Sequence, residues 1–158
     1  MFYTWDEAAE DATKIIFSEV RKTPKVSVSD LRSVLDRFIE SLYQSPGGNM
    51  QAKVAWCCLG ANAVELSQTT LQPLTVLEVT TTLVRKQRDY GPENIRRFGR
   101  HGLMVRMHDK IARLENLAAH GRTPENETVH DTYMDIVGYS AIGIMWEDGN
   151  FLLPLAES

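Results

Sequence analysis

Three acidic residues near the C-terminal end of the sequence have the spacing of one helix face. Glu127, Asp131 and Asp135 are four residues apart within the segment 127–139. Because a helix turns about 100° per residue, their side chains would lie in a band roughly 80° wide. Apolar residues occupy most of the remaining circumference, which predicts a largely buried helix. Unpaired carboxylates are unfavourable there, so we expect a cation to face them.

A divalent metal ion is one cation that would satisfy such a stripe. Mg²⁺ is commonly held by one or two carboxylates together with water and substrate phosphates. The sequence therefore predicts a Mg²⁺ site, and its candidate ligands are Glu127, Asp131, Asp135, Glu78 and Asp109. Glu78 is included because a second predicted helix could complete an acidic cluster from across the bundle.

Basic side chains are the alternative cations, and a predicted helix over 103–118 supplies them. Arg106, Lys110 and Arg113 follow one another at spacings of four and three and fall on one side, with Asp109 near them. A charged stripe opposite an apolar one is also what an ordinary surface helix shows, so a solvated face is an equally good interpretation of these residues.

A further cluster lies at 86–94, where a predicted helix meets a glycine and a proline. An aromatic side chain beside basic residues, such as Tyr90, could stack on a nucleobase. The ordinary alternative is that Tyr90 and Gly91 only form a turn.

Apolar periodicity and capping residues predict an all-α fold of about five to six helices without a convincing strand. Thr4 and Glu7 form a capping box for the first helix, Ser29 can cap the second, and Pro73 suits the start of the fourth. The expected helices span about 5–21, 29–44, 50–66, 73–88, 103–120 and a last one that begins at 123–126 and runs to 146. Residues 96–102 are predicted to be a basic loop or short turn.

Length and charge limit the classes of protein. With 158 residues, one domain is expected, made of an N-terminal part (1–72), the motif-bearing helices (73–147) and a tail (148–158). The 17 basic and 21 acidic residues give a net charge of −4, which argues against duplex DNA as the main ligand. The N-terminus lacks the pattern of a signal peptide and no apolar run is long enough for a membrane span, so we expect an intracellular protein without a membrane partner.

Several common chemistries are missing from the sequence. Cys57 and Cys58 are adjacent, which argues against a disulfide framework and a zinc site and predicts two small buried side chains. No phosphate-binding P-loop, dinucleotide-binding loop or HExxH motif is present, and the four histidines belong to no recognised catalytic pattern.

Three ordered motifs together resemble a known family. They are K-x-x-D-Y-G at 86–91, R-x-x-D-K-x-x-R-L at 106–114 and E-x-x-x-D-T-x-x-D-I-x-x-Y at 127–139. They resemble the phage nucleotide-modification-associated domain family, first type, over roughly 77–146. The resemblance implies a phage or prophage protein, located in the cytoplasm of the host cell, that acts near nucleotide metabolism or DNA-base modification.

The acidic helix is also similar, more loosely, to the E-x-x-D helix of the all-α nucleoside triphosphate pyrophosphatases, which are MazG-like and dimeric dUTPase-like enzymes. That similarity implies Mg²⁺ held between helices and a possible homodimer, for which the apolar helix around Trp56 would suffice. Those enzymes pair an E-x-x-E helix with the E-x-x-D helix, whereas this chain has acids four apart and only Glu78 on the partner helix. The departure weakens the expectation of hydrolysis.

Two main hypotheses follow, both with a nucleotide or deoxynucleotide as ligand. The first is a Mg²⁺-dependent enzyme that cleaves a nucleoside triphosphate, with Glu127, Asp131 and Asp135 as its catalytic carboxylates. The second is a non-catalytic nucleotide-binding module or an adaptor for a modification enzyme. The residues expected to contact the ligand are Lys86, Asp89, Tyr90, Asn94, Arg106, Lys110 and Arg113. A third, purely structural interpretation has the acids satisfied by Arg106 and Arg113 alone.

Overall fold

The protein was examined as a computed structural model that describes residues 1–21, 26–44, 48–121 and 128–157. Within these ranges all regular structure is helical, which confirms the all-α expectation. The helices are α1 (Trp5–Ser18), α2 (Val28–Gln44), α3 (Asn49–Ser67), α4 (Val76–Tyr90), α5 (Glu93–Arg96), α6 (Gly99–His120) and α7 (Val129–Glu147). None of the described helices is long and apolar enough to cross a membrane.

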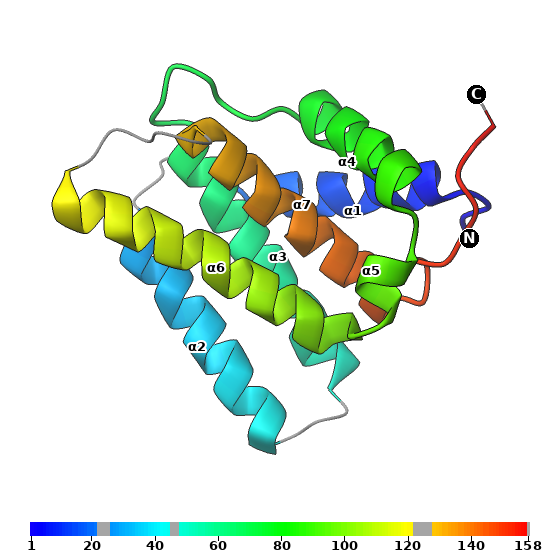
Figure 1. The fold of residues 1–158 in the computed structure, drawn as a ribbon, viewed down its shortest axis with the longest axis horizontal. Helices are drawn as coiled ribbons and strands as arrows, with labels where there is room; N and C mark the ends of the chain where they lie inside the picture. The colour runs from blue at the N-terminus through cyan, green and yellow to red at the C-terminus, as the bar shows by residue number, and fades with distance from the viewer. Residues whose placement is uncertain (22–25, 45–47, 122–127, 158) are drawn as a thin grey trace.

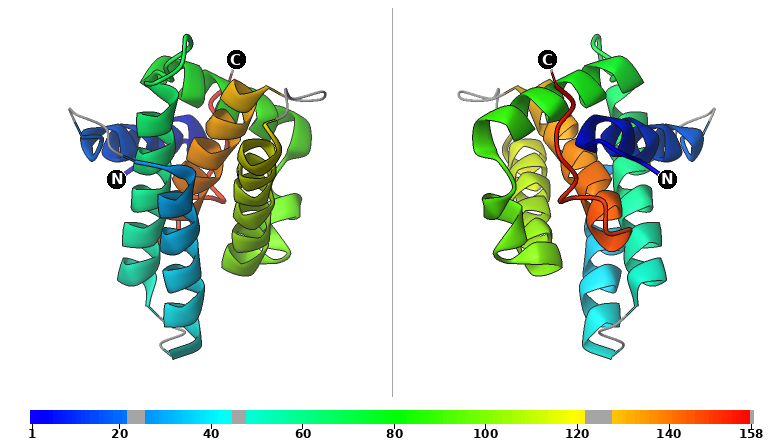
Figure 2. Two further views of the ribbon diagram at one scale, coloured as in Figure 1. Left: turned by 90° about the vertical axis from the view of Figure 1, so that its left-hand side faces the viewer. Right: turned by 90° about the vertical axis from the view of Figure 1, so that its right-hand side faces the viewer.

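Helices α3 and α7 form the centre of the bundle and make its most extensive contact. Helix α7 is nearly apolar around its circumference, as expected of a helix enclosed by others, and α3 is buried on all sides in its second half, from Leu59 to Ser67. Around them, α1 crosses behind, α2 lies along α3, α6 lies in front of α7, and α4 packs on α1 and α7 (Figures 1 and 2). The motif-bearing helices α4, α6 and α7 therefore meet on one face of the molecule.

Two glycines allow the central helices to approach closely. A Cβ atom on Gly143 of α7 would lie 2.5 Å from the ring of Trp56 on α3, and one on Gly60 would lie 2.9 Å from Ile16 of α1. Trp56 is fully buried and also packs edge-on against Phe38, with ring centroids 4.9 Å apart. Because of this packing, the ring of Trp56 offers no surface to a second copy of the chain.

The helix starts confirm one predicted cap and correct two. The hydroxyl oxygen of Thr4 accepts a hydrogen bond from the backbone N–H of Glu7, as the capping box predicted. Ser29 lies inside the first turn of α2 rather than before it, because the helix begins at Val28. Pro73 does not open α4 either, since Thr75 is the residue that caps this helix, through the backbone N–H of Glu78.

Two other boundaries differ from the sequence-based expectation. The predicted basic loop at 96–102 contains the end of the one-turn helix α5 and the first turn of α6. Helix α7 begins at Val129 with Thr128 as its N-cap. The start expected at 123–126 lies outside the described residues, and so does Glu127.

The two cysteines are free thiols, and the expectation that both are buried is wrong. Cys57 is partly buried and Cys58 is exposed, because α3 turns this side toward an open hollow of about 740 Å³ shared with α1 and α2. Desolvation raises the pKa of the Cys57 thiol to about 11. Because the thiolate is the reactive form, this cysteine should be a poor nucleophile at neutral pH.

We expect Gly143→Ala to destabilise the fold by about 1–3 kcal/mol, because the added methyl group would overlap the rigid ring of Trp56. The matched control is Gly138→Ala on the same helix, whose methyl group would meet only a terminal methyl of Leu83, at 3.2 Å. Urea unfolding measures both variants. A free energy of unfolding for Gly143→Ala equal to or above that of Gly138→Ala would contradict the close packing of α3 on α7.

Candidate functional site

The carboxylate of Asp135 lies between two lysines from different helices. The Nζ atom of Lys86 on α4 is 2.9 Å from Oδ1, and the Nζ atom of Lys110 on α6 is 2.9 Å from Oδ2. The Asp135 side chain is only 13% exposed. The cation that the sequence requires opposite this acid is therefore present in the described residues as two ammonium groups.

A hollow of about 180 Å³ lies beside this ion cluster, between α4, α5, α6 and α7. Five of the predicted site residues line it, namely Lys86, Tyr90, Asn94, Arg106 and Asp135. The rest of the lining is largely apolar and is contributed mainly by Val79, Leu83, Ile95, Met134, Tyr139 and Ile142. The sequence-based selection thus converges on one place, although its members are spread over four helices.

A second hollow, of about 340 Å³, adjoins the first and is more polar. The two share Thr82, Lys86, Met134 and Asp135 as lining residues, so they form one continuous depression, here called the α4–α7 groove. Glu78, Arg85, His130 and Asp131 complete the lining of the second hollow. Its volume alone falls within the roughly 300–1,000 Å³ of small-molecule sites.

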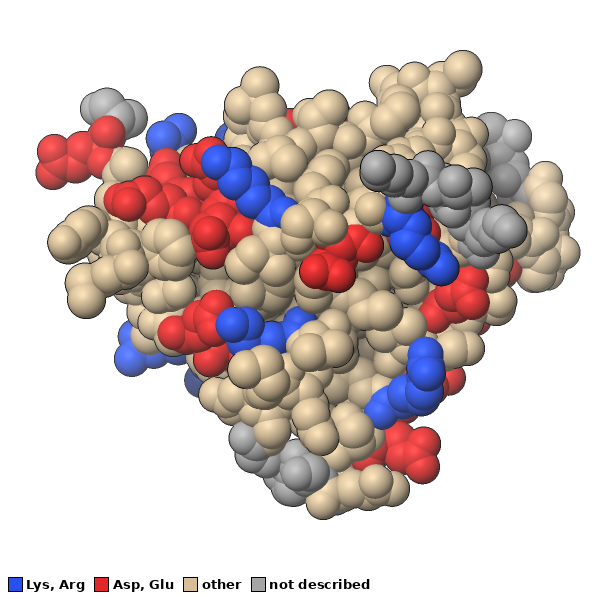
Figure 3. Space-filling view, turned by 180° about the vertical axis from the view of Figure 1, so that it is seen from behind, with Lys and Arg blue, Asp and Glu red and all other residues tan. Residues whose placement is uncertain are grey.

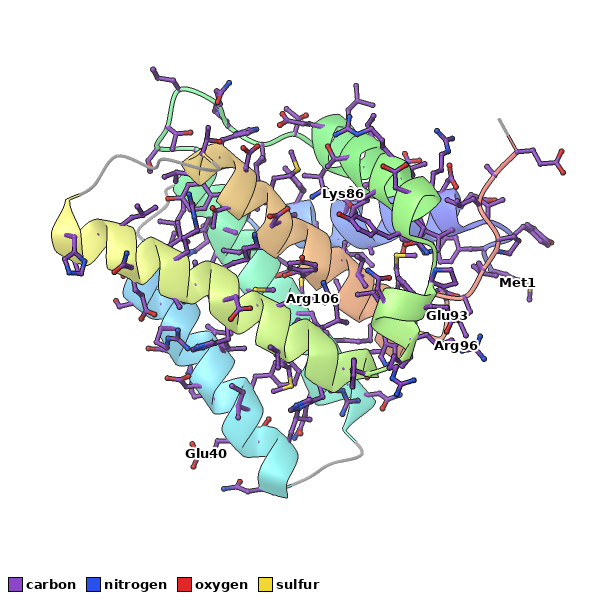
Figure 4. The ribbon with its side chains drawn as sticks, viewed as in Figure 1. Met1, Glu40, Lys86, Glu93, Arg96 and Arg106 are labelled. Carbon is purple, nitrogen blue, oxygen red and sulfur yellow. The ribbon has the colours of Figure 1, made fainter. Side chains whose placement is uncertain are left out.

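Positive charge exceeds negative charge around Asp135. Lys86 is half exposed at the edge of the groove, Lys110 is 22% exposed, and Arg106 is half-buried in the wall. Figure 4 shows Lys86 between α4 and α7, and Arg106 between α6 and α7. Within the part of the chain that is described, Arg106 has no hydrogen-bond or ion-pair partner. Among the described residues, Lys86, Lys110 and Arg106 therefore lie at or near Asp135, and the carboxylates of Glu78 and Asp131 border the adjoining hollow.

Asp131 has a different environment from Asp135. It is exposed at the first turn of α7, where its carboxylate accepts a hydrogen bond from the backbone N–H of Thr128 and completes a capping box. The expectation that the whole acidic stripe is buried is therefore wrong for Asp131, because the apolar surroundings of α7 do not extend to its first turn.

His130 is a site residue that sequence reasoning set aside. Its Nε2 lies 2.5 Å from a carboxylate oxygen of Glu78, and its Nδ1 lies 3.0 Å from the backbone oxygen of Gln72. Both partners are acceptors when Glu78 is ionised, so a doubly protonated ring satisfies both contacts. The only sequence signal was its place beside Asp131, since Glu78 lies 52 residues away.

The remaining predicted residues are distributed as follows. Asp89 and Asp109 are exposed and line neither hollow of the groove. Arg113 donates a hydrogen bond to the hydroxyl of Thr132. Within the described ranges no three His, Cys, Asp or Glu side chains are placed to hold a metal ion. Because Glu127 lies outside these ranges, the Mg²⁺ site stays a prediction.

We expect Asp135→Asn to lower the free energy of unfolding by about 1–3 kcal/mol, because it leaves two ammonium groups facing a neutral amide. The control is Asp109→Asn, an exposed carboxylate on α6 that should change stability by less than about 0.5 kcal/mol. Urea unfolding compares the free energies of unfolding of the two variants. A double-mutant cycle of Asp135→Asn with Lys110→Met measures the coupling energy between Asp135 and Lys110. Equal effects of the two Asp→Asn changes would show that the cluster contributes nothing to the fold.

Comparison with known proteins points to the same part of the chain. A sequence model of the family described as nucleotide modification associated domain 1 matches residues 86–146. No curated protein and no solved structure matches the chain. The matched segment runs from Lys86 on α4 through α5 and α6 to Trp146 on α7, so it contains the Asp135 cluster and most of the groove, and its description associates this region with nucleotide modification.

Proposed function

We propose that the α4–α7 groove binds a nucleotide through its phosphate groups. The observation that carries the proposal is the convergence of cationic groups on this groove, with Lys86 half exposed and Arg106 without a partner among the described residues. An oligophosphate supplies the anionic oxygens that such groups bind well, and Arg106 could donate two hydrogen bonds at once. The family match supports a nucleotide over other phosphorylated molecules.

Asp135 would then orient the lysines rather than compete with the ligand. By holding both ammonium groups 2.9 Å from its oxygens, it fixes their positions before a ligand arrives. A site organised in advance loses less side-chain entropy on binding. The apolar hollow below Tyr90 and Asn94 provides a surface for the base and sugar, with the aromatic ring available for stacking.

A second candidate function is Mg²⁺-dependent cleavage of a bound nucleoside triphosphate, as in the MazG-like enzymes. One observation favours it, because Glu78, Asp131 and Asp135 border the same hollow. Against it, each of these carboxylates is already engaged, with His130, the helix cap and the lysines respectively. We therefore favour binding, either to sequester a nucleotide or to present it to a modification enzyme, with a phage pathway as the proposed setting.

The test is calorimetric titration of the 158-residue chain with each deoxynucleoside triphosphate. We expect Lys86→Met and Arg106→Met each to weaken binding by about tenfold to a hundredfold, since each removes a charge-assisted hydrogen bond. Lys14→Met is the matched control, because Lys14 is an exposed lysine of α1 whose ammonium group lies 2.9 Å from Glu10 of the same helix. Titration with Mg²⁺ and with a chelator shows whether binding requires the metal.

The outcomes separate the alternatives. Binding of no nucleotide, or equal affinities of the two groove variants and Lys14→Met, would refute the proposal. Chromatography of the Mg²⁺ mixtures tests for catalysis. Formation of nucleoside monophosphate and diphosphate by the wild type but not by Asp135→Asn would favour the enzyme. Unchanged nucleotide would favour the binding module.

A further inference from the structure

The corner of the molecule beside the groove concentrates positive charge and exposed aromatic rings. Residues 85–101 contain six of the chain's 17 Lys and Arg residues but only two of its 21 Asp and Glu residues. Among the Phe, Tyr and Trp side chains that the structure describes, three are exposed, and two of these are here, Tyr90 at 68% and Phe98 at 65% exposure. Guanidinium groups interleaved with open rings are the features that bind the phosphates and bases of unpaired nucleic acid.

Three anchors hold this corner in place against α7. Ile95 of α5 is buried in the core. Gly99 has a φ of +55°, which favours glycine, and a Cβ atom there would lie 2.8 Å from the ring of Trp146. The Nε atom of Arg100 donates to the buried carboxylate of Glu147 at 2.8 Å. The corner is therefore a fixed part of the bundle surface.

The anchors leave the residues between them facing outward. Arg96, Arg97 and Phe98, here called the α5 surface, are all exposed. The guanidinium of Arg97 lies 5.8 Å from the centre of the Phe98 ring. Arg96 is 3.4 Å from Glu93, but both side chains are well exposed, so this ion pair is weak and can give way to a phosphate. Figure 4 shows Arg96 and Glu93 at the outer edge of the molecule.

The α5 surface continues directly from the groove. Tyr90, Asn94 and Ile95 line the groove, and Arg96 to Phe98 are the next residues along the chain. On the rear face, by contrast, acidic side chains gather near the start of α1, whose first turns include Asp6, Glu7 and Glu10 (Figure 3). A polyanion that extends out of the groove is therefore attracted by the arginines of the α5 surface and repelled by the acidic side chains of the rear face.

We infer that the α5 surface binds the nucleotides next to the one in the groove, so that the ligand is single-stranded nucleic acid rather than a free nucleotide. The inference rests on the proposed function of the groove. A single strand fits better than a duplex because stacking on Tyr90 and Phe98 needs unpaired bases, and because a chain with a net charge of −4 offers a duplex no broad basic face.

The experiment determines the affinity of the 158-residue chain for labelled oligothymidylate and oligouridylate by fluorescence anisotropy. Its affinity for thymidine 5′-phosphate is determined by calorimetry. We expect the oligonucleotides to bind about tenfold tighter than the mononucleotide, and Arg96→Gln/Arg97→Gln and Phe98→Ala to abolish that difference without changing mononucleotide binding. The double variant should also reduce the slope of log affinity against log salt by about 1.4, since each contact with a single-stranded phosphate contributes about 0.7. Lys14→Gln/Arg37→Gln removes the same charge elsewhere and should match wild type.

Each alternative outcome has a definite meaning. If the α5 and control variants lose the same oligonucleotide affinity, the attraction is unspecific and the inference is overturned. If polyglutamate at equal charge concentration displaces the oligonucleotide, the surface suits an acidic protein partner instead, which also overturns the inference. Equal affinities for oligonucleotide and mononucleotide, both weakened by Lys86→Met, would overturn it while supporting the groove. Oligonucleotide binding that depends on Phe98 but is unaffected by Lys86→Met and Arg106→Met would refute the proposed groove function and support strand contact at α5.

Discussion

A carboxylate on a helix that is otherwise enclosed by apolar neighbours constrains the whole motif-bearing face of this protein. Asp135 is mostly buried, and a charge in that position is stable only when opposite charges and hydrogen-bond donors reach it. Lys86 reaches it from α4 and Lys110 from α6. Three helices therefore have to pack so that these side chains meet at one point. The groove lies beside this meeting point, and Leu83 of α4 and Gly138 of α7 both line it.

The centre of the bundle provides the rigidity that this cluster needs. Helices α3 and α7 approach closely where Gly143 meets Trp56, and a fully buried tryptophan cannot shift without disturbing Phe38 on α2 as well. Close-packed interiors transmit such restraints, so the position of α7 relative to its neighbours is well defined. At the far end of α7, Trp146 and Glu147 hold the α5–α6 corner through Gly99 and Arg100. One helix thus positions both the Asp135 cluster and the α5 surface.

The α4–α7 groove is distinguished by the arrangement of its charged side chains, and among the described residues it contains no familiar catalytic motif. Of the carboxylates bordering the groove, Glu78 contacts His130, Asp131 caps α7 and Asp135 binds two lysines. Arg106 contributes charge to the wall without such a partner in the described ranges. An arrangement in which each acid is engaged and Arg106 is left for a ligand suits the binding of a phosphate-bearing molecule, and the family match over residues 86–146 agrees with a role near nucleotides.

The sequence by itself determined the helical class and most helix positions, and it selected residues that the fold brings to one groove. Periodicity of three and four locates buried helix faces, and a buried acid on such a face requires a cation, which is why Asp135 and the basic residues of α6 could be selected, whereas Lys86 was selected with the cluster at 86–94. Tertiary structure decided which partners meet: Lys86 and Lys110 for Asp135, Thr132 for Arg113, and His130 for Glu78. These pairs join residues from different helices, and their distances depend on how the helices pack, which helical spacing within one segment does not encode. For the same reason, the exposure of Asp131 and Cys58 could not be predicted, since it depends on which parts of α7 and α3 the neighbouring helices cover.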